Sequence, residues 1–164
     1  MLIILKNKET LQYKNFFFKC VIGKKGLTSI KKEGDKKTPK GKFALGKLYY
    51  RKDRIKNIET KIPCVPINKT MGWCDDVSNK KKYNREIIVS KSIKHEKMYR
   101  KDTIYDLVIP IKYNFFKPKI GKGSAIFLHV TKKYKPTAGC IAINKNDFLI
   151  LLRLIDKKTK IIIS

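Results

Sequence analysis

The chain has 164 residues, of which 40 are Lys or Arg and 13 are Asp or Glu, so its formal net charge is +27 at pH 7. Hydrophobic residues make up 42% of the sequence, which excludes an intrinsically disordered chain and favours one globular domain over residues 1–164. Lysines are spread along the whole sequence, without a recognition helix, an RNP-like aromatic pattern or zinc-finger spacing. Nucleic acid is therefore not expected to be the main partner, although a non-catalytic basic module that binds a polyanion remains an alternative.

The first half of the chain predicts a series of short antiparallel strands, because β-branched and aromatic residues dominate it. The apolar residues there are too continuous for a sheet with one solvent-exposed face, so we expect both faces to be buried, as in a β-sandwich. A loop rich in Gly and Lys interrupts the series between residues 23 and 42. The predicted strands are Leu2–Leu5, Thr10–Lys14, Phe16–Ile22, Phe43–Tyr50 and, as an edge strand that holds two prolines, Ile62–Ile67.

The second half adds the helical part of the prediction. Residues 69–86 form a polar stretch around Trp73, the only Trp of the chain, and are expected to be a loop. The remaining predicted elements are a short helix at Ser92–Tyr99 capped by Ser92, a strand at Ile104–Tyr113 interrupted at Pro110, a helix at Phe148–Ile155 and a last strand at Lys160–Ile163. The fold class is therefore predicted to be mainly β with one or two short helices.

One stretch, Ser124–Ile143, carries a pattern typical of nucleophilic catalysis. His129 follows an apolar run that reads as a strand, Ala125–Leu128, and Cys140 opens the next apolar run after a basic loop. A rigidly held imidazole can act as a general base, and in such pairs it lowers the thiol pKa from about 8.5 to between about 3.5 and 7.5. The alternative is that Cys140 is a small buried hydrophobic residue.

Gly139 strengthens the catalytic interpretation. Without a side chain it can turn its own N–H, or that of Cys140, toward an oxyanion, an interaction worth about 2.7–4 kcal/mol per donor. A zinc hydrolase that uses His95, His129 and a cysteine is disfavoured, because these residues lack the local pairing of zinc ligands. No metal and no organic cofactor is therefore expected.

The compartment is the least defined property. Only four apolar residues, Leu2–Leu5, separate Met1 from Lys6, which is too short for the core of a signal peptide, and no apolar run reaches membrane-spanning length. We therefore expect no membrane span and a cytoplasmic location, unless an unrecognised route exports the protein. The cysteines form no Cys-x-x-Cys pair, which fits a reducing compartment; they are Cys20, Cys64, Cys74 and Cys140.

The sequence Gly-Ser-Ala-Ile-Phe-Leu-His, which ends at His129, and Pro-Thr-Ala-Gly-Cys-Ile-Ala-Ile, which contains Cys140, resemble the signature of the L,D-transpeptidase (YkuD-like) family. Upstream, Thr38–Phe43 resembles the family's Thr-Pro-x-Gly-x-Phe hairpin. Two positions depart from the pattern, since Ala138 replaces the usual His and Ala142 replaces a frequent Arg. The resemblance covers most of the chain and implies a YkuD-like β-sandwich from a divergent branch.

The resemblance also implies a reaction. Cys140 would form a thioester with a peptidoglycan stem peptide and pass the acyl group to an amine, which cross-links the cell wall. With water as the acceptor, the same intermediate would make the protein an L,D-carboxypeptidase, and a non-catalytic module that binds the wall is the alternative of another class. The backbone carbonyl of Val130 is implied as the group that orients His129.

Further residues are candidates for substrate contact. Arg85 could bind a substrate carboxylate through two parallel hydrogen bonds. Alternatively, Trp73 could fill the edge of the core, and His95 could be a structural or surface residue. The resemblance extends to the Trp-Cys-Asp-Asp and Tyr-Asn-Arg segments and on that basis implies Trp73, Asp75, Asn84 and Arg85; the other candidates are His95 and Thr137. The sequence does not indicate the oligomeric state.

Overall fold

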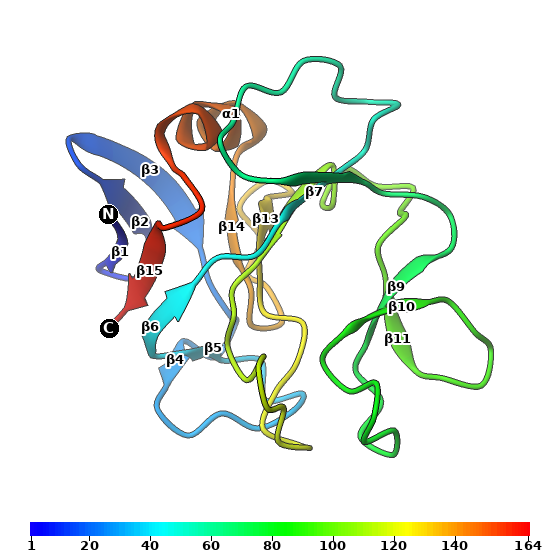
Figure 1. The fold of residues 1–164 in the computed structure, drawn as a ribbon. Helices are drawn as coiled ribbons and strands as arrows, with labels where there is room; N and C mark the ends of the chain where they lie inside the picture. The colour runs from blue at the N-terminus through cyan, green and yellow to red at the C-terminus, as the bar shows by residue number, and fades with distance from the viewer.

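The computed structural model describes residues 1–164. Its frame is a ten-stranded sheet in the order β6-β15-β1-β2-β3-β14-β13-β12-β7-β8 (Figure 1). The strands are β1 (Leu2–Lys6), β2 (Thr10–Tyr13), β3 (Phe16–Val21), β6 (Gly41–Ala44), β7 (Leu48–Tyr50), β8 (Cys64–Pro66), β12 (Leu107–Pro110), β13 (Phe127–Val130), β14 (Ile141–Ile143) and β15 (Lys160–Ile163). As predicted, the segment with two prolines forms an edge strand: β8 contains Pro66, directly follows Pro63 and lies at one end of the sheet.

The sheet folds onto itself at β3. The first part of this strand, Phe16–Lys19, pairs with β2, whereas Cys20 and Val21 pair with β14. We call β6, β15, β1, β2 and β3 the first leaf, and β14, β13, β12, β7 and β8 the second leaf. A single hydrophobic cluster joins the inner faces of both leaves, with Ile3 and Leu11 from the first and Leu128 from the second. The fold is therefore mainly β and a sandwich, as predicted.

The only helix, α1 (Lys145–Leu154), packs onto the same core. Asn144 caps it, because its Oδ1 accepts the N–H of Asp147 at 2.9 Å. Phe148, Leu151 and Leu152 are its buried residues, which confirms the helix predicted at Phe148–Ile155. No helix of the structure has the length and apolar character needed to cross a membrane.

A second, smaller layer covers the other face of the second leaf. It is a three-stranded sheet in the order β10-β9-β11, made of β9 (Met71–Cys74), β10 (Glu86–Ile88) and β11 (His95–Lys97) (Figure 1). Trp73 from this sheet and Phe127 from the second leaf share a hydrophobic cluster. A two-stranded sheet of β4 (Leu27–Thr28) and β5 (Thr38–Pro39) completes the fold. The second leaf is thus buried on both faces, and the functional site lies on the side of the smaller cluster.

Several local predictions were wrong. Ser92–Tyr99 is not a helix, because β11 within it pairs with β9; helix propensity is a weak preference that pairing with a sheet overrides. The predicted loop at 69–86 contains β9 and the first residue of β10. Phe43–Tyr50 is divided between β6 and β7, which lie in different leaves.

Candidate active site

Two parallel strands of the second leaf bring His129 and Cys140 together. In this pairing His129 lies opposite Ala142, and side chains two residues apart on a strand point to the same face. Cys140 directly precedes β14, and its Sγ accepts the N–H of Phe127 at 3.3 Å. We had expected His129 to follow the strand, but it lies inside β13. It shares one face of the sheet with Cys140.

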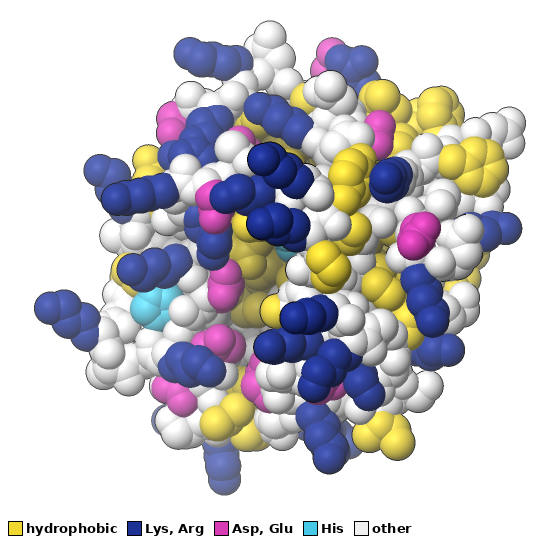
Figure 2. Space-filling model, turned by 180° about the vertical axis from the view of Figure 1, so that it is seen from behind, with side chains coloured by type: hydrophobic (Ala, Val, Ile, Leu, Met, Phe, Trp, Pro, Cys, Tyr) yellow, Lys and Arg dark blue, Asp and Glu magenta, His cyan; other side chains and the backbone are white.

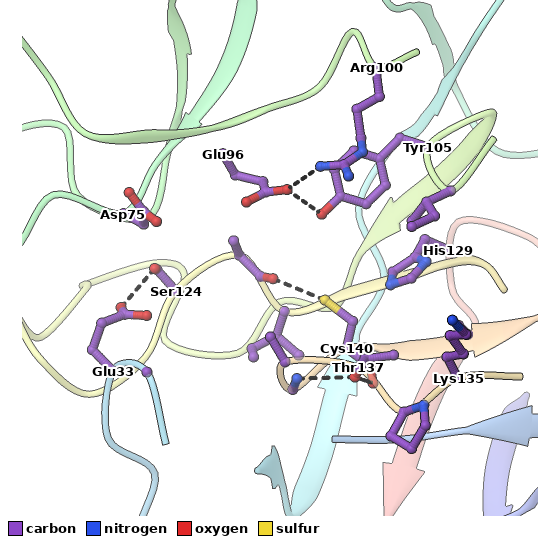
Figure 3. Close-up of a pocket in the computed structure, with 18 of the residues that line it drawn as sticks. Glu33, Asp75, Glu96, Arg100, Tyr105, Ser124, His129, Lys135, Thr137 and Cys140 are labelled. Carbon is purple, nitrogen blue, oxygen red and sulfur yellow. Dashed lines mark hydrogen bonds and ion pairs between the residues drawn. The ribbon is translucent and has the colours of Figure 1, made fainter. Parts of the chain in front are cut away.

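Both side chains line a cavity of about 740 Å³ (Figure 3). The chain between β13 and β14 forms one wall, segments near Glu33 and Asp75 form another, and Glu96 and Arg100 lie above the nucleophile. From outside, the molecule has a hollow in this face with Lys and Arg side chains around it (Figure 2). The candidate nucleophile thus lies in a space large enough for a peptide segment.

His129 is held in the tautomer that a general base requires. The side chain is 7% exposed, and its Nδ1 lies 2.8 Å from the carbonyl oxygen of Val130, so Nδ1 must carry the proton and donate. This is the contact that the family resemblance implied. The ring also meets the edge of Tyr105 at 5.4 Å between centroids. Burial lowers the pKa of His129 to about 4, against the opposing effect of the Val130 hydrogen bond, so at neutral pH Nε2 is free to accept a proton.

The thiol of Cys140 is neutral at rest. Burial raises the pKa of Cys140 to about 12, and the Sγ–H donates to the carbonyl oxygen of Ala125 at 3.3 Å. The expectation that the imidazole lowers the thiol pKa is therefore wrong for the free protein, because loss of hydration outweighs any benefit to the thiolate. The lowered pKa of His129 and the raised pKa of Cys140 disfavour a preformed ion pair, so Cys140 would lose its proton only during attack.

The turn before Cys140 determines which N–H groups are available. The N–H of Gly139 donates to Thr137 Oγ1 at 3.0 Å, and the Thr137 hydroxyl donates to the carbonyl oxygen of Cys140 at 2.7 Å. The N–H of Cys140 itself donates to no acceptor in the chain. Of the two donors considered from sequence, the N–H of Cys140 is therefore free to donate to an oxyanion, while Thr137 shapes the turn.

Sequence reasoning assigned no role to Thr38, although it lies in the hairpin motif. Its buried hydroxyl donates to the carbonyl oxygen of Gly139 at 2.8 Å and accepts the N–H of Gly23 at 2.9 Å. At Gly139, φ is +145°, and an added Cβ would lie 2.9 Å from the carbonyl oxygen of Lys37. The hairpin thus fixes the residue that precedes the nucleophile, and only glycine fits there.

A hydrogen-bonded network of Glu96, Tyr105, Arg100 and Asp102, which the sequence motifs did not predict, lies beside the imidazole of His129. Glu96 Oε1 accepts from Tyr105 Oη at 3.0 Å and from Arg100 at 3.1 Å. Arg100 also donates to both oxygens of Asp102, at 2.9 and 2.8 Å. Because Tyr105 packs on His129, the network fixes one side of the imidazole ring (Figure 3).

Of the candidate substrate residues, Asp75 and Thr137 line the cavity. Burial raises the pKa of Asp75, whose Oδ1 is buried without a partner, while Oδ2 lies 3.9 Å from Lys94 Nζ. Ala138 and Ala142, which replace the family's His and Arg, also line the cavity. Their small side chains leave space beside the reacting pair.

Trp73 and Asn84 lie outside the cavity and have structural contacts. Trp73 is buried in the smaller cluster, the alternative considered from sequence, and its Nε1 donates to Asn84 Oδ1 at 2.9 Å. The same oxygen accepts the N–H of Ala125 at 3.0 Å, and Asn84 Nδ2 donates to the carbonyl oxygens of Tyr113 and Asn114. Asn84 thereby positions Ala125, whose carbonyl receives the Cys140 thiol.

The side chains of Arg85 and His95 do not line the cavity either, although Lys94 and Glu96 on both sides of His95 do. Arg85 is exposed and borders a separate pocket of about 310 Å³. Nδ1 of His95 lies 2.7 Å from the carbonyl oxygen of Ile93. No three His, Cys, Asp or Glu side chains gather in an arrangement that would hold a metal ion.

Comparison with known proteins agrees with this geometry. The family model described as the L,D-transpeptidase catalytic domain, YkuD, matches residues 1–163. Searches of curated proteins and of solved structures returned no match. Over nearly its whole length, the chain therefore belongs to the YkuD family of L,D-transpeptidase catalytic domains, enzymes that act on peptidoglycan.

Proposed function

We propose that this protein is a cysteine acyltransferase that forms a thioester between Cys140 and a peptidoglycan stem peptide and passes the acyl group to an amine. The observation that carries the proposal is the cavity that Cys140 and His129 share, in which the thiol donates to the carbonyl oxygen of Ala125 and the imidazole has a fixed tautomer. The family match supports peptidoglycan as the substrate class.

The acylation step uses groups that the site provides. Cys140 Sγ attacks the peptide carbonyl carbon while its proton moves to Nε2 of His129, and the N–H of Cys140 donates to the oxyanion. Collapse of the tetrahedral intermediate breaks the C–N bond, and His129 returns the proton to the departing amine. An acceptor amine then attacks the thioester carbonyl and gives a proton to His129. The C–S bond breaks, and His129 returns this proton to the sulfur of Cys140, which restores the thiol.

The charges around the cavity suit a peptide that carries both amines and carboxylates. Glu33 and Asp75 lie at one end and Lys135 at the other, with Cys140 between them (Figure 3). Carboxylates can attract the ammonium form of an amine acceptor, and lysines can attract substrate carboxylates. The free side chain of Lys135 makes no ion pair with an acidic residue, so it is available to a ligand.

Water is the second candidate acceptor, which would make the protein an L,D-carboxypeptidase. The small residues Ala138 and Ala142 favour this possibility, because they leave room for water beside the thioester. Tetrapeptide stems incubated with and without an amine-bearing stem distinguish the two acceptors by mass spectrometry. The transpeptidase proposal predicts a cross-linked dimer, and the carboxypeptidase alternative predicts only a tripeptide.

Two cysteine variants control this experiment. Cys140→Ala should abolish both products, whereas Cys64→Ala, which removes an exposed thiol elsewhere, should leave them unchanged. Full turnover by Cys140→Ala would exclude the thiol mechanism. Salt-sensitive binding of wall fragments by both variants, without any product from wild type, would instead indicate a basic binding module.

A further inference from the structure

The outer face of the first leaf carries an uncovered apolar surface. Strand alternation places Leu2, Ile4, Phe17 and Ile162 on this face, opposite the buried side chains of the same strands, Ile3, Leu5, Phe18 and Ile161. Leu2, Ile4 and Ile162 are half-buried there. Ile4 lies beside Ile162 on one side and beside Gln12 on the other, and Gln12 lies beside Phe17. The row therefore crosses four adjacent strands, and Phe17 is 64% exposed.

The charges on this face are of one sign. Lys6, Lys19, Lys42 and Lys160 are exposed and alternate onto the same side as the apolar row. None of them lies within ion-pair distance of a carboxylate, and the strands of the first leaf contain no Asp or Glu. Lys19 Nζ lies 4.8 Å from the centroid of the Tyr134 ring, and no carboxylate neutralises any of the four lysines. The face thus combines apolar side chains with positive charge.

No other element lies over this face. In Figure 1 the first leaf forms one side of the molecule, and the small sheet of β9, β10 and β11 lies at the opposite side. The cavity of Cys140 lies between the second leaf and the part of the chain that contains β9 and β11. A partner on the first leaf would therefore leave the cavity open.

We propose that the outer face of the first leaf binds the surface of an anionic phospholipid bilayer. Lysines near the surface of such a leaflet gain electrostatic energy from the lipid head groups, and Phe17 with the aliphatic row can enter the interface. A nucleic acid would leave the aliphatic side chains without a partner, because its backbone offers charge and its bases offer stacking. A second copy of the same face would bring four lysines against four lysines.

Sedimentation with vesicles tests the proposal. One variant combines Phe17→Ser, Lys6→Gln and Lys160→Gln. Its matched control combines Phe116→Ser, Lys117→Gln and Lys119→Gln, exposed positions between β12 and β13 that lie outside both the face and the cavity lining. Wild type should bind vesicles that contain phosphatidylglycerol, bind phosphatidylcholine vesicles weakly, and lose binding as salt rises.

The face variant should bind phosphatidylglycerol vesicles about thirtyfold more weakly. It lacks two lysines, and each lysine near an anionic leaflet contributes about 1 kcal/mol to binding. The control should bind as wild type does, and circular dichroism should show both variants folded. Equal losses in the two variants, equal binding to both lipids, or absence of vesicle binding by wild type would overturn the proposal. The proposal would also be overturned if wild type self-associated without binding lipid and the face variant abolished this self-association. Turnover of stem peptides should be the same in both variants, so failure here is separate from failure of the proposed enzyme.

Discussion

The hydroxyl of Thr38 donates a 2.8 Å hydrogen bond to the carbonyl oxygen of Gly139, the residue before the candidate nucleophile. The two residues are 101 positions apart in the sequence. The bond joins the hairpin near the N-terminus to the turn that presents Cys140, so a motif far from the reacting pair determines how its backbone is oriented.

Thr38→Val should lower the rate of acylation and the stability together. The change leaves the Gly23 N–H and the Gly139 carbonyl unpaired in a buried site, at a cost of about 1–3 kcal/mol for each group left without a partner. Thr38→Ser keeps the hydroxyl and should restore most of the activity. Chemical denaturation and the rate of thioester formation are the two measurements, and a fully active Val variant would contradict this positioning role.

Gly139→Ala should abolish acylation and destabilise the fold. The backbone φ of +145° is strained for any residue with a Cβ, and that atom would lie 2.9 Å from the carbonyl oxygen of Lys37. Such strain costs about 1–3 kcal/mol. Gly121→Ala is the matched control, because its φ is also positive but no atom lies near its added Cβ, so a loss of acylation only at Gly139 identifies the close approach as the cause.

The buried His129 makes stability depend on pH. Its pKa falls from 6.5 in the unfolded chain to about 4 in the fold, so between these values the unfolded chain binds more protons. Stability is therefore complete above pH 6.5 and falls as the pH drops toward 4, by up to about 3 kcal/mol. Urea unfolding of wild type and His129→Gln across this range isolates the effect, and parallel curves for the two proteins would contradict it.

Substitutions of the neighbouring residues Asn84 and Arg85 should have different effects, because Asn84 is structural and Arg85 is on the surface. Asn84→Ala removes the partner of Trp73 Nε1 and of the Ala125 N–H, and should lower the free energy of unfolding by about 1–3 kcal/mol or more. Arg85→Ala alters an exposed side chain outside the cavity and should leave stability and KM for the stem peptide unchanged. A large increase in KM for Arg85→Ala would return this residue to the substrate site.

Local patterns were enough to predict much of the fold. The early strands, α1 and β15 have strong β-branched or apolar signals, and the structure confirms them. The helix predicted at Ser92–Tyr99 was wrong because Ser92 resembles a helix cap. Only the pairing with β9 shows that His95–Lys97 is a strand. Such pairing depends on residues about twenty positions away, which local propensity does not contain.

The candidate site was predictable to a similar degree. His129 and Cys140 could be found because each borders a strong apolar run, and their common cavity supports the assignment. Glu96 and Tyr105 could not be found, since their relation to His129 arises only from the packing of separate loops. The pKa direction of Cys140 was also missed, because burial is a property of the folded chain.

The central claim is that Cys140 forms the acyl-enzyme, and intact-mass spectrometry tests it most directly. Wild type, Cys140→Ala and Cys64→Ala are each incubated with a tetrapeptide stem and, separately, with a carbapenem as an acylating mimic. We predict one adduct on wild type and on Cys64→Ala, and none on Cys140→Ala. An adduct that persists in Cys140→Ala, or no adduct on wild type with either reagent, would contradict the claim.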